Sequence, residues 1–321
     1  MREAMARAEV GDEQRGLDPT VNELQQRVAE LLGHEAALYL PSGTMCNAIS
    51  YRLHLRPGGD EVILDRTAHP IVAEAGSPGG FSGAMTFQLD SRHGVFGAEE
   101  LRAALRPPGD RYAPRSRLVS VEQTTNIAGG HVWPLQTMRE VLEVARENEL
   151  RAHLDGARLM NAVVASGVSA ADYASGFDTA WIDFTKGLGA PVGACLAGSR
   201  ELIDEAWRWK QMIGGSLRQA GIIAAAGIYA LDHHVERLAE DHANAKAFAE
   251  GLAALPGVAI DPGEVETNIV IFTVEDAPAW AHSAEQKGVE VLALDGTHLR
   301  AVTHLDVTRE DIGLALELLA S

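Results

Sequence analysis

Short apolar runs alternate with helical patterns over the first two thirds of the chain. The runs end in glycine or polar turns, as buried strands do, and the segments between them repeat apolar residues at helical spacing. The pattern predicts strands at 36–40, 61–64, 117–121, 151–154, 180–184 and 193–198. It predicts helices at 18–32, 98–105, 135–148, 158–166 and from 201 to about 255, and leaves 81–97 irregular and glycine-rich. Such alternation favours an α/β fold, a mostly parallel sheet with helices on both faces.

The pattern changes after Pro256-Gly257 and Asp261-Pro262-Gly263. Beyond them we predict strands at 268–274, 289–294 and 299–304, and helices at 280–287 and 308–319. Thr308-x-x-Asp311 resembles a capping box at the start of the last helix. The sequence therefore predicts an N-terminal segment (1–17), a large α/β domain (18–235) and a smaller C-terminal α/β domain (236–321).

Composition narrows the class of protein. The 321 residues are 46% hydrophobic, which indicates a globular chain, and the net charge of −18 argues against nucleic acid or an anionic membrane as a partner. Cys46 and Cys195 show neither metal-ligand spacing nor a disulfide framework, so we expect no metal and a reducing, cytoplasmic setting. The first residues lack the apolar core of a signal peptide. The alanine-rich helix expected at 221–231 is too short to span a bilayer and is typical of a helix buried between layers or subunits.

Lys186 lies just after the strand predicted at 180–184, in the run Lys186-Gly187-Leu188-Gly189-Ala190-Pro191. Ligands of open α/β sheets bind at such strand ends. A desolvated lysine there would be a nucleophile towards an aldehyde. The alternative is a surface lysine in a glycine-rich turn.

Two further motifs follow predicted strands. Ser42-Gly43-Thr44 opens a helix, where free N–H groups and a hydroxyl suit an anion such as a phosphate, although a plain helix cap is the alternative. Asp155 could hold a protonated ring nitrogen and Arg158 a carboxylate, unless they are a helix cap and a surface ion pair. A phosphate cradle, an acid and an aldehyde-capturing lysine are what pyridoxal phosphate requires of a protein.

Three more side chains are candidates. His69, in Thr67-Ala68-His69-Pro70, could stack on the cofactor ring. Arg218 precedes the alanine-rich helix and could contact an anion across a subunit boundary. Arg300 lies on a predicted small-domain strand that could face the cleft. Each has an ordinary structural alternative, a loop histidine or an ion pair.

The motifs P-S-G-T-M, T-A-H, D-G-A-R-L, K-G-L-G-A-P-V-G, G-G-S-L-R-Q-A-G and V-T-H-L-D-V resemble those of the low-specificity L-threonine aldolases, in order and over nearly the whole chain. The resemblance implies a fold type I, aspartate-aminotransferase-like α/β/α large domain and a homo-oligomer, usually a tetramer, with active sites at subunit boundaries. It implies that Lys186 bonds the cofactor, Asp155 holds its ring nitrogen and His69 stacks on its ring. It also implies that Ser42, Gly43, Thr44 and Arg218 hold the phosphate, and that Arg158 and Arg300 hold the substrate carboxylate.

The sequence departs from the family pattern in its substrate half. The family's initial S-D-T motif lies upstream of the point where this sequence starts. Thr125 replaces a histidine that lies near the substrate hydroxyl, Gln211 replaces a lysine, and Arg15 stands where an aromatic residue is usual.

The resemblance predicts a carbon–carbon lyase of amino-acid metabolism that cleaves β-hydroxy-α-amino acids, such as L-threonine or L-allo-threonine, to glycine and an aldehyde. Because Thr125 cannot replace the histidine as a base, His69 or a bound water would take the hydroxyl proton. The alternatives are β-elimination, dehydration or transaldol transfer with the same cofactor, or a non-catalytic protein that retains the cofactor.

Overall fold

A seven-stranded sheet forms the centre of the larger part of the molecule. The computed structural model describes residues 1–321, and the strand order is β1-β7-β6-β5-β4-β2-β3. Only β7 is antiparallel to its neighbours, β1 and β6, so the sheet is mostly parallel. The strands are β1 (Ala36–Leu40), β2 (Asp60–Asp65), β3 (Met85–Leu89), β4 (Arg115–Glu122), β5 (Arg151–Gly156), β6 (Thr179–Asp183) and β7 (Ala194–Gly198).

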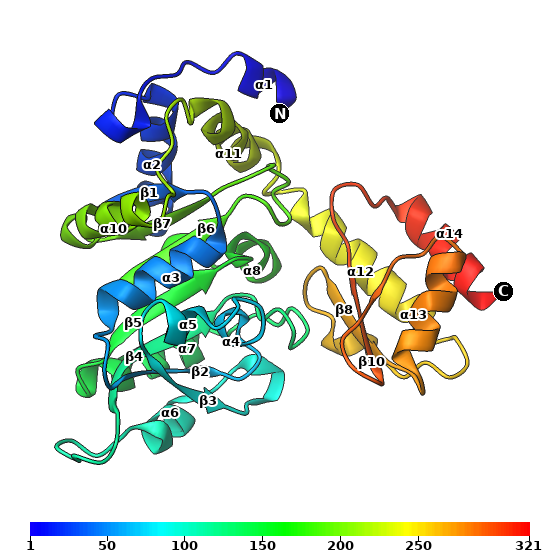
Figure 1. Ribbon diagram of the computed structural model, residues 1–321. Helices are drawn as coiled ribbons and strands as arrows, with labels where there is room; N and C mark the ends of the chain where they lie inside the picture. The colour runs from blue at the N-terminus through cyan, green and yellow to red at the C-terminus, as the bar shows by residue number, and fades with distance from the viewer.

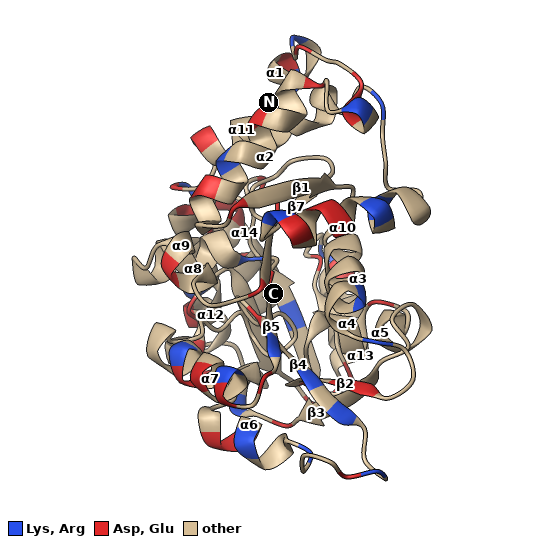
Figure 2. Cartoon of the chain, turned by 90° about the vertical axis from the view of Figure 1, so that its left-hand side faces the viewer, with Lys and Arg blue, Asp and Glu red and all other residues tan.

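Helices cover both faces of this sheet, as the alternating pattern predicts (Figure 2). One layer contains α3 (Gly43–His54) and α10 (Arg200–Met212), with the one-turn helices α4 (His69–Val72) and α5 (Ser77–Gly80) beside them. The other contains α2 (Pro19–Leu32), α6 (Ala98–Ala104), α7 (Leu135–Glu147), α8 (Leu159–Ser166) and α9 (Ala170–Ala174). The alanine-rich helix α11 (Gly221–His233) packs against α2 and against α1 (Arg2–Ala6). The α/β/α layering confirms the predicted fold class.

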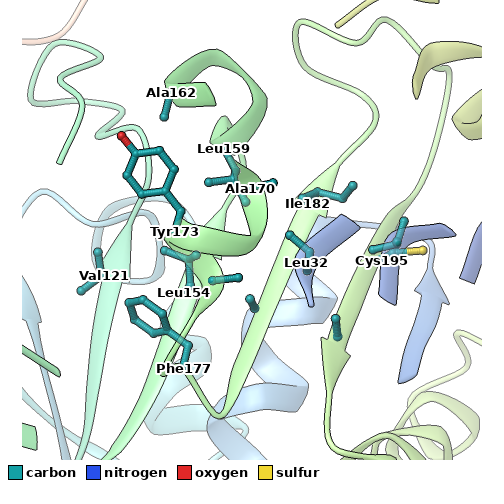
Figure 3. Close-up of a cluster of buried hydrophobic side chains, with 14 of the residues drawn as sticks. Leu32, Val121, Leu154, Leu159, Ala162, Ala170, Tyr173, Phe177, Ile182 and Cys195 are labelled. Atoms are coloured by element: carbon teal, nitrogen blue, oxygen red, sulfur yellow. The ribbon is translucent and has the colours of Figure 1, made fainter. Parts of the chain in front are cut away.

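The core of the large sheet is apolar on both faces. The strands β2, β6 and β7 are buried at every position, so they form continuous runs without alternation. In Figure 3, Leu154 and Ile182 project from the strands into the cluster that also contains Leu159 and Ala170 of the covering helices. The largest hydrophobic cluster holds 41 buried residues. This packing makes the sheet a rigid support for the loops at its strand ends.

The C-terminal part has its own sheet and its own core. The antiparallel order is β8-β10-β9, formed by β8 (Ile269–Thr273), β9 (Leu292–Ala293) and β10 (His298–Val302). It packs with α12 (Leu238–Leu252), α13 (Ala277–Gln286) and α14 (Arg309–Ala320) (Figure 1). The predicted capping box is present: Thr308 Oγ1 accepts from Asp311 N, and Asp311 accepts from Thr308 N.

One prediction about secondary structure is wrong. The segment 81–97 contains strand β3, which pairs in parallel with β2 at the sheet edge. Its side chains are half-buried or exposed, so the apolar run that marks a buried strand is absent. Short 3₁₀ turns, which the pattern did not resolve, occur at η1 (Glu13–Arg15), η2 (Arg92–Gly94) and η3 (Pro262–Glu264).

Three of the covering helices carry charged outer faces. Lysine, arginine, aspartate and glutamate are concentrated on the outer faces of α6, α7 and α10 (Figure 2). None of the helices combines the length and the apolar character needed to cross a membrane.

Candidate active site

The carboxyl ends of β5 and β6 lie side by side and carry Asp155 and the Lys186 loop. The two strands are parallel, with Asp155 opposite Trp181. After β6, the Asp183 carboxylate accepts from the backbone N and the hydroxyl of Thr185, both at 2.6 Å, and this turn presents Lys186 with an exposed side chain. Gly193 must be glycine, because a Cβ there would lie 2.3 Å from the Tyr39 hydroxyl oxygen. The glycine run thus shapes the loop that carries Lys186.

Asn47, on helix α3, orients the Asp155 carboxylate through a hydrogen bond. It is fully buried on α3, and its Nδ2 donates to Asp155 Oδ2 at 2.7 Å and to Glu74 Oε1 at 2.8 Å. Its Oδ1 accepts from Trp181 Nε1 at 2.8 Å and contacts His153 Nε2 at 3.0 Å. Burial raises the pKa of Asp155 to about 6, and the hydrogen bond from Asn47 opposes that rise. A cationic group at Asp155 would therefore find a buried, oriented carboxylate.

His69 is held by a second carboxylate. It begins α4, and its Nδ1 lies 2.8 Å from Glu74 Oε1, while Ser77 Oγ donates to Glu74 Oε2 at 3.0 Å. The hydrogen bond to Glu74 raises the pKa of His69 despite partial burial. Because Glu74 also accepts from Asn47, one hydrogen-bonded network joins His69 to Asp155.

Arg158 and Arg300 form the cationic part of the site. Arg158 is 7% exposed at the start of α8, and Arg300 on β10 donates through Nη2 to Asn126 Oδ1 at 2.8 Å. The Nε atoms of both arginines are buried without a hydrogen-bond partner. Burial and the nearby charge of Arg158 lower the pKa of Arg300 to about 10, so the two guanidinium groups lie near each other. Unpaired buried donors on two neighbouring arginines are suited to binding a carboxylate.

Glu122 lies beside these arginines at the end of β4. Its Oε2 accepts from Asn126 N at 3.0 Å and its Oε1 from His69 N at 3.3 Å. Burial, with the charge of Asp155, raises the pKa of Glu122 well above its ordinary value. The hydrogen bond from Asn126 N ties the loop after β4 to Glu122.

Thr125 lies inside the loop after β4. Its side chain is buried, its Oγ1 accepts from His131 N at 3.0 Å, and its methyl group packs near Gly94. The structure therefore shows a loop-fixing hydrogen bond for Thr125.

Arg218 lies away from the strand ends. It precedes α11, its side chain is 62% exposed, and Nη1 donates to Asp12 Oδ2 at 2.9 Å. Nearby, the fully buried Lys210 pairs with Glu13 and donates to the Tyr39 carbonyl at 2.7 Å, while Gln211 is exposed. Within the single chain, Arg218 thus faces the N-terminal segment.

The helix α3 begins at the predicted phosphate motif. Ser42 Oγ accepts from Met45 N at 3.2 Å and caps the helix, which leaves the first N–H groups and the exposed Thr44 hydroxyl free. Gly43 has no room for a side chain, because a Cβ would lie 2.2 Å from the Trp181 ring. With Asp155, Lys186 and the unpaired arginine donors, these groups fit pyridoxal phosphate and an amino-acid carboxylate.

Four residues of this network escape the sequence analysis: Asn47, Glu74, Glu122 and Asn126. Glu122 follows the end of a predicted strand, which is the same signal that marks Asp155. Asn47 is a polar residue on the buried side of a helix, a weaker sign. Nothing local marks Glu74, whose role depends on the packing of α3 against α5.

Comparison with known proteins agrees with this geometry. Residues 1–277 match the model of the beta-eliminating lyase family. The low specificity L-threonine aldolase of Escherichia coli K12 is 40% identical over 313 residues, which cover 97% of this chain and 92% of that protein. The threonine aldolase of Leishmania major superposes with a TM-score of 0.84 at 21% identity, covering 99% of this chain and 94% of that one. A structure of SPT with PLP gives a TM-score of 0.71 at 19% identity, covering 99% and 81%.

The sheet order, the layered helices and the lysine and aspartate at adjacent strand ends define a fold type I enzyme of the pyridoxal-phosphate class. The chain belongs to the beta-eliminating lyase family, with the low-specificity L-threonine aldolases as its relatives. The resemblance of the sequence motifs to this family is thereby confirmed.

Proposed function

We propose that this chain is a pyridoxal-phosphate-dependent aldolase that cleaves β-hydroxy-α-amino acids of the L-threonine or L-allo-threonine type to glycine and an aldehyde. Family membership supports the reaction class. The observation that carries the proposal is the pair of neighbouring arginines, Arg158 and Arg300, whose buried Nε atoms lack partners. They provide a carboxylate receptor near the Asp155 and Lys186 strand ends, as a free amino-acid substrate requires.

The proposed cofactor contacts follow from the donor set. Lys186 Nζ would bond the cofactor aldehyde, and Asp155 would hold the ring nitrogen in its protonated form. Ser42 shapes the turn from which the N–H groups of Gly43 and Thr44 and the Thr44 hydroxyl would bind the phosphate. When bound, pyridoxal phosphate supplies an electron-withdrawing ring that stabilises the negative charge left at the substrate Cα.

The proton from the substrate hydroxyl would move to His69 Nε2. Its Nδ1 is held by Glu74, which fixes the ring and leaves Nε2 as the free nitrogen. Thr125 supports this choice indirectly, because a threonine hydroxyl is too weak a base to take up a proton at neutral pH and its oxygen already accepts a hydrogen bond from His131 N. Since the hydrogen bond to Glu74 raises the pKa of His69, the neutral base forms only as the pH rises through that raised value.

A substrate screen tests the reaction. The cofactor-loaded protein is incubated with L-threonine, L-allo-threonine and phenylserine, and glycine and ammonia are both quantified. Glycine with an equal amount of aldehyde is the expected result. Ammonia with a keto acid would show β-elimination or dehydration instead, and glycine from none of the three would refute the aldolase.

We propose further that the protein is a cytoplasmic homo-oligomer. The Arg218→Ala variant tests this assembly most directly. Ile222 on α11 is a large hydrophobic side chain that is 47% exposed, which supports a contact of this helix with another chain. Arg218, 62% exposed, would reach the phosphate side of a neighbouring cofactor in a tetramer. Arg218→Ala should then weaken cofactor retention without changing the monomer fold. A fully active monomer in sedimentation would contradict this assembly.

A further inference from the structure

Two histidines and a glutamate from distant parts of the sequence meet at one place outside the cofactor site. His93 lies in η2 after β3, His131 in the loop between β4 and α7, and Glu264 at the end of η3 before β8. One donor atom from each lies within 4.8 Å of the other two. The cluster therefore joins loops of the seven-stranded sheet to a turn of the C-terminal part.

Hydrogen bonding assigns the free nitrogen of His131. Its Nδ1 lies 3.0 Å from Glu266 Oε1, and Glu266 Oε2 accepts from Val132 N at 2.8 Å. A carboxylate only accepts, so Nδ1 carries a proton, and in the neutral imidazole Nε2 keeps its lone pair. A carboxylate behind a histidine is the arrangement that orients metal-binding imidazoles in proteins. His131 itself is only 6% exposed, so its ring is held in place.

His93 presents a second lone pair to the same space. The two imidazole rings lie with centroids 3.8 Å apart. Arg92 Nε donates to His93 Nε2 at 2.7 Å, so that nitrogen acts as the acceptor, because arginine has no acceptor of its own. His93 adopts a left-handed backbone (φ 60°, ψ 15°), which is uncommon for a residue other than glycine.

Glu264 completes the donor set, and a cation already bridges it. Glu264 Oε2 lies 3.1 Å from His93 Nε2, and Arg92 Nη2 donates to Glu264 Oε1 at 3.0 Å. The Arg92 side chain is 80% exposed, so it can leave without opening the core. The guanidinium of Arg92 therefore neutralises the Glu264 carboxylate in the place where a metal ion would do so.

We propose that His93 Nε2, His131 Nε2 and the Glu264 carboxylate bind a divalent transition-metal ion of the zinc class, with water as the fourth ligand. Two imidazoles and one carboxylate are ligands typical of zinc. Tetrahedral ligands at about 2.0–2.1 Å from the ion lie about 3.4 Å apart. His93 Nε2 and Glu264 Oε2, 3.1 Å apart, already meet this spacing, and since all the donor atoms lie within 4.8 Å of one another, the other pairs need to close by at most about 1.4 Å. Displacement of the exposed Arg92 provides that freedom.

The ion would have a structural role and would take no part in the reaction. His131 N donates to Thr125 Oγ1, and Gly94, next to His93, packs against the Thr125 methyl group. The same loop continues to Asn126, which accepts from Arg300. Metal bound at this cluster would therefore stiffen the loop after β4 and tie it to the turn before β8.

The test is direct metal binding by the cofactor-loaded, untagged chain after removal of trace metals. Calorimetric titration with zinc chloride should show one ion per chain, and cobalt(II) should give the absorption of a tetrahedral site. His131→Ala and His93→Asn should abolish both signals; asparagine tolerates the left-handed backbone, so His93→Asn is expected to fold. Glu266→Gln should weaken affinity about tenfold to a hundredfold through the orientation of His131.

Two controls separate the cluster from general metal affinity. Arg92→Ala removes the competing cation and should tighten zinc binding. His282→Ala changes an exposed histidine (side chain 70% exposed) on α13 and should leave the titration unchanged. Absence of stoichiometric zinc binding, or zinc binding that survives both His93→Asn and His131→Ala in folded protein, would overturn the proposal.

Discussion

Replacing Asn47 with alanine should destabilise the cofactor-free protein by about 4 kcal/mol at pH 8. The change leaves three buried groups without partners: Asp155 Oδ2, His153 Nε2 and Trp181 Nε1. A hydrogen bond to a charged group contributes about 1.5–3 kcal/mol, and each neutral orphan costs about 1 kcal/mol or more. Glu74 also loses Asn47, but His69 and Ser77 still bond to it.

The loss should depend on pH, with a sign that follows from Asp155. Its folded-state pKa is about 6 and already above the ordinary value, because of burial. Without the Asn47 donor it should rise by about one to two units, at about 1.4 kcal/mol per unit. Below about pH 6 Asp155 is protonated in both folded proteins, so this part of the loss is absent. It appears as the pH rises through the wild-type value.

Urea denaturation at pH 5 and pH 8 measures both parts of the effect. We expect a loss of about 2–3 kcal/mol at pH 5 and the larger loss at pH 8. Asn244→Ala is the matched control, since this buried asparagine bonds only the Val307 carbonyl, at 3.0 Å, far from Asp155. A loss at pH 8 no larger than that of the control would show that water replaces the Asn47 amide and would refute the reasoning.

Three further changes test other parts of the site. Lys186→Ala should remove the visible absorption band of the lysine-bound cofactor; a borohydride-sensitive band in the variant would mean that another lysine bonds it. Arg158→Lys loses the planar fork that meets a carboxylate, so KM should rise about tenfold to a hundredfold with a smaller change in kcat. Glu74→Gln removes the hydrogen-bonded charge that raises the pKa of His69, so the rising limb of the pH–rate profile should move to lower pH; an unchanged limb would exclude His69 as the base.

The fold could be predicted where a buried element has a continuous apolar run or clear helix-capping residues in its own sequence. The strand at 36–40 matches β1, and the strands at 151–154 and 180–184 match β5 and β6 to within two residues, because these strands are buried on both faces. The helix from Asp18 matches α2, since Asp18 caps it and Gly33 (φ 68°) ends it. The edge strand β3 escaped because an edge with half-exposed side chains carries no apolar run.

The residue pattern marks part of the candidate site where a reactive side chain follows a predicted strand, although Glu122 has the same position and was missed. Asp155 and Lys186 have this position, and parallel pairing places both strand ends at one sheet edge. Asn47 lies in the middle of a helix, and its four hydrogen bonds reach residues 27 to 134 positions away. No local pattern encodes such partners, so this network becomes visible only in the folded chain.

The buried ion pair between Lys210 and Glu13 ties the N-terminal segment to the large α/β part of the molecule. Glu13 also accepts from Leu217 N at 2.7 Å and its own N donates to the Arg218 carbonyl at 2.9 Å. Cutting the chain after this turn would strand an ammonium group in the protein interior, at about 3–5 kcal/mol. An affinity tag or a fused domain joined to this end by a short linker would strain the Lys210–Glu13 ion pair. The exposed turn around Tyr112, whose side chain touches nothing, is the better place for an insertion.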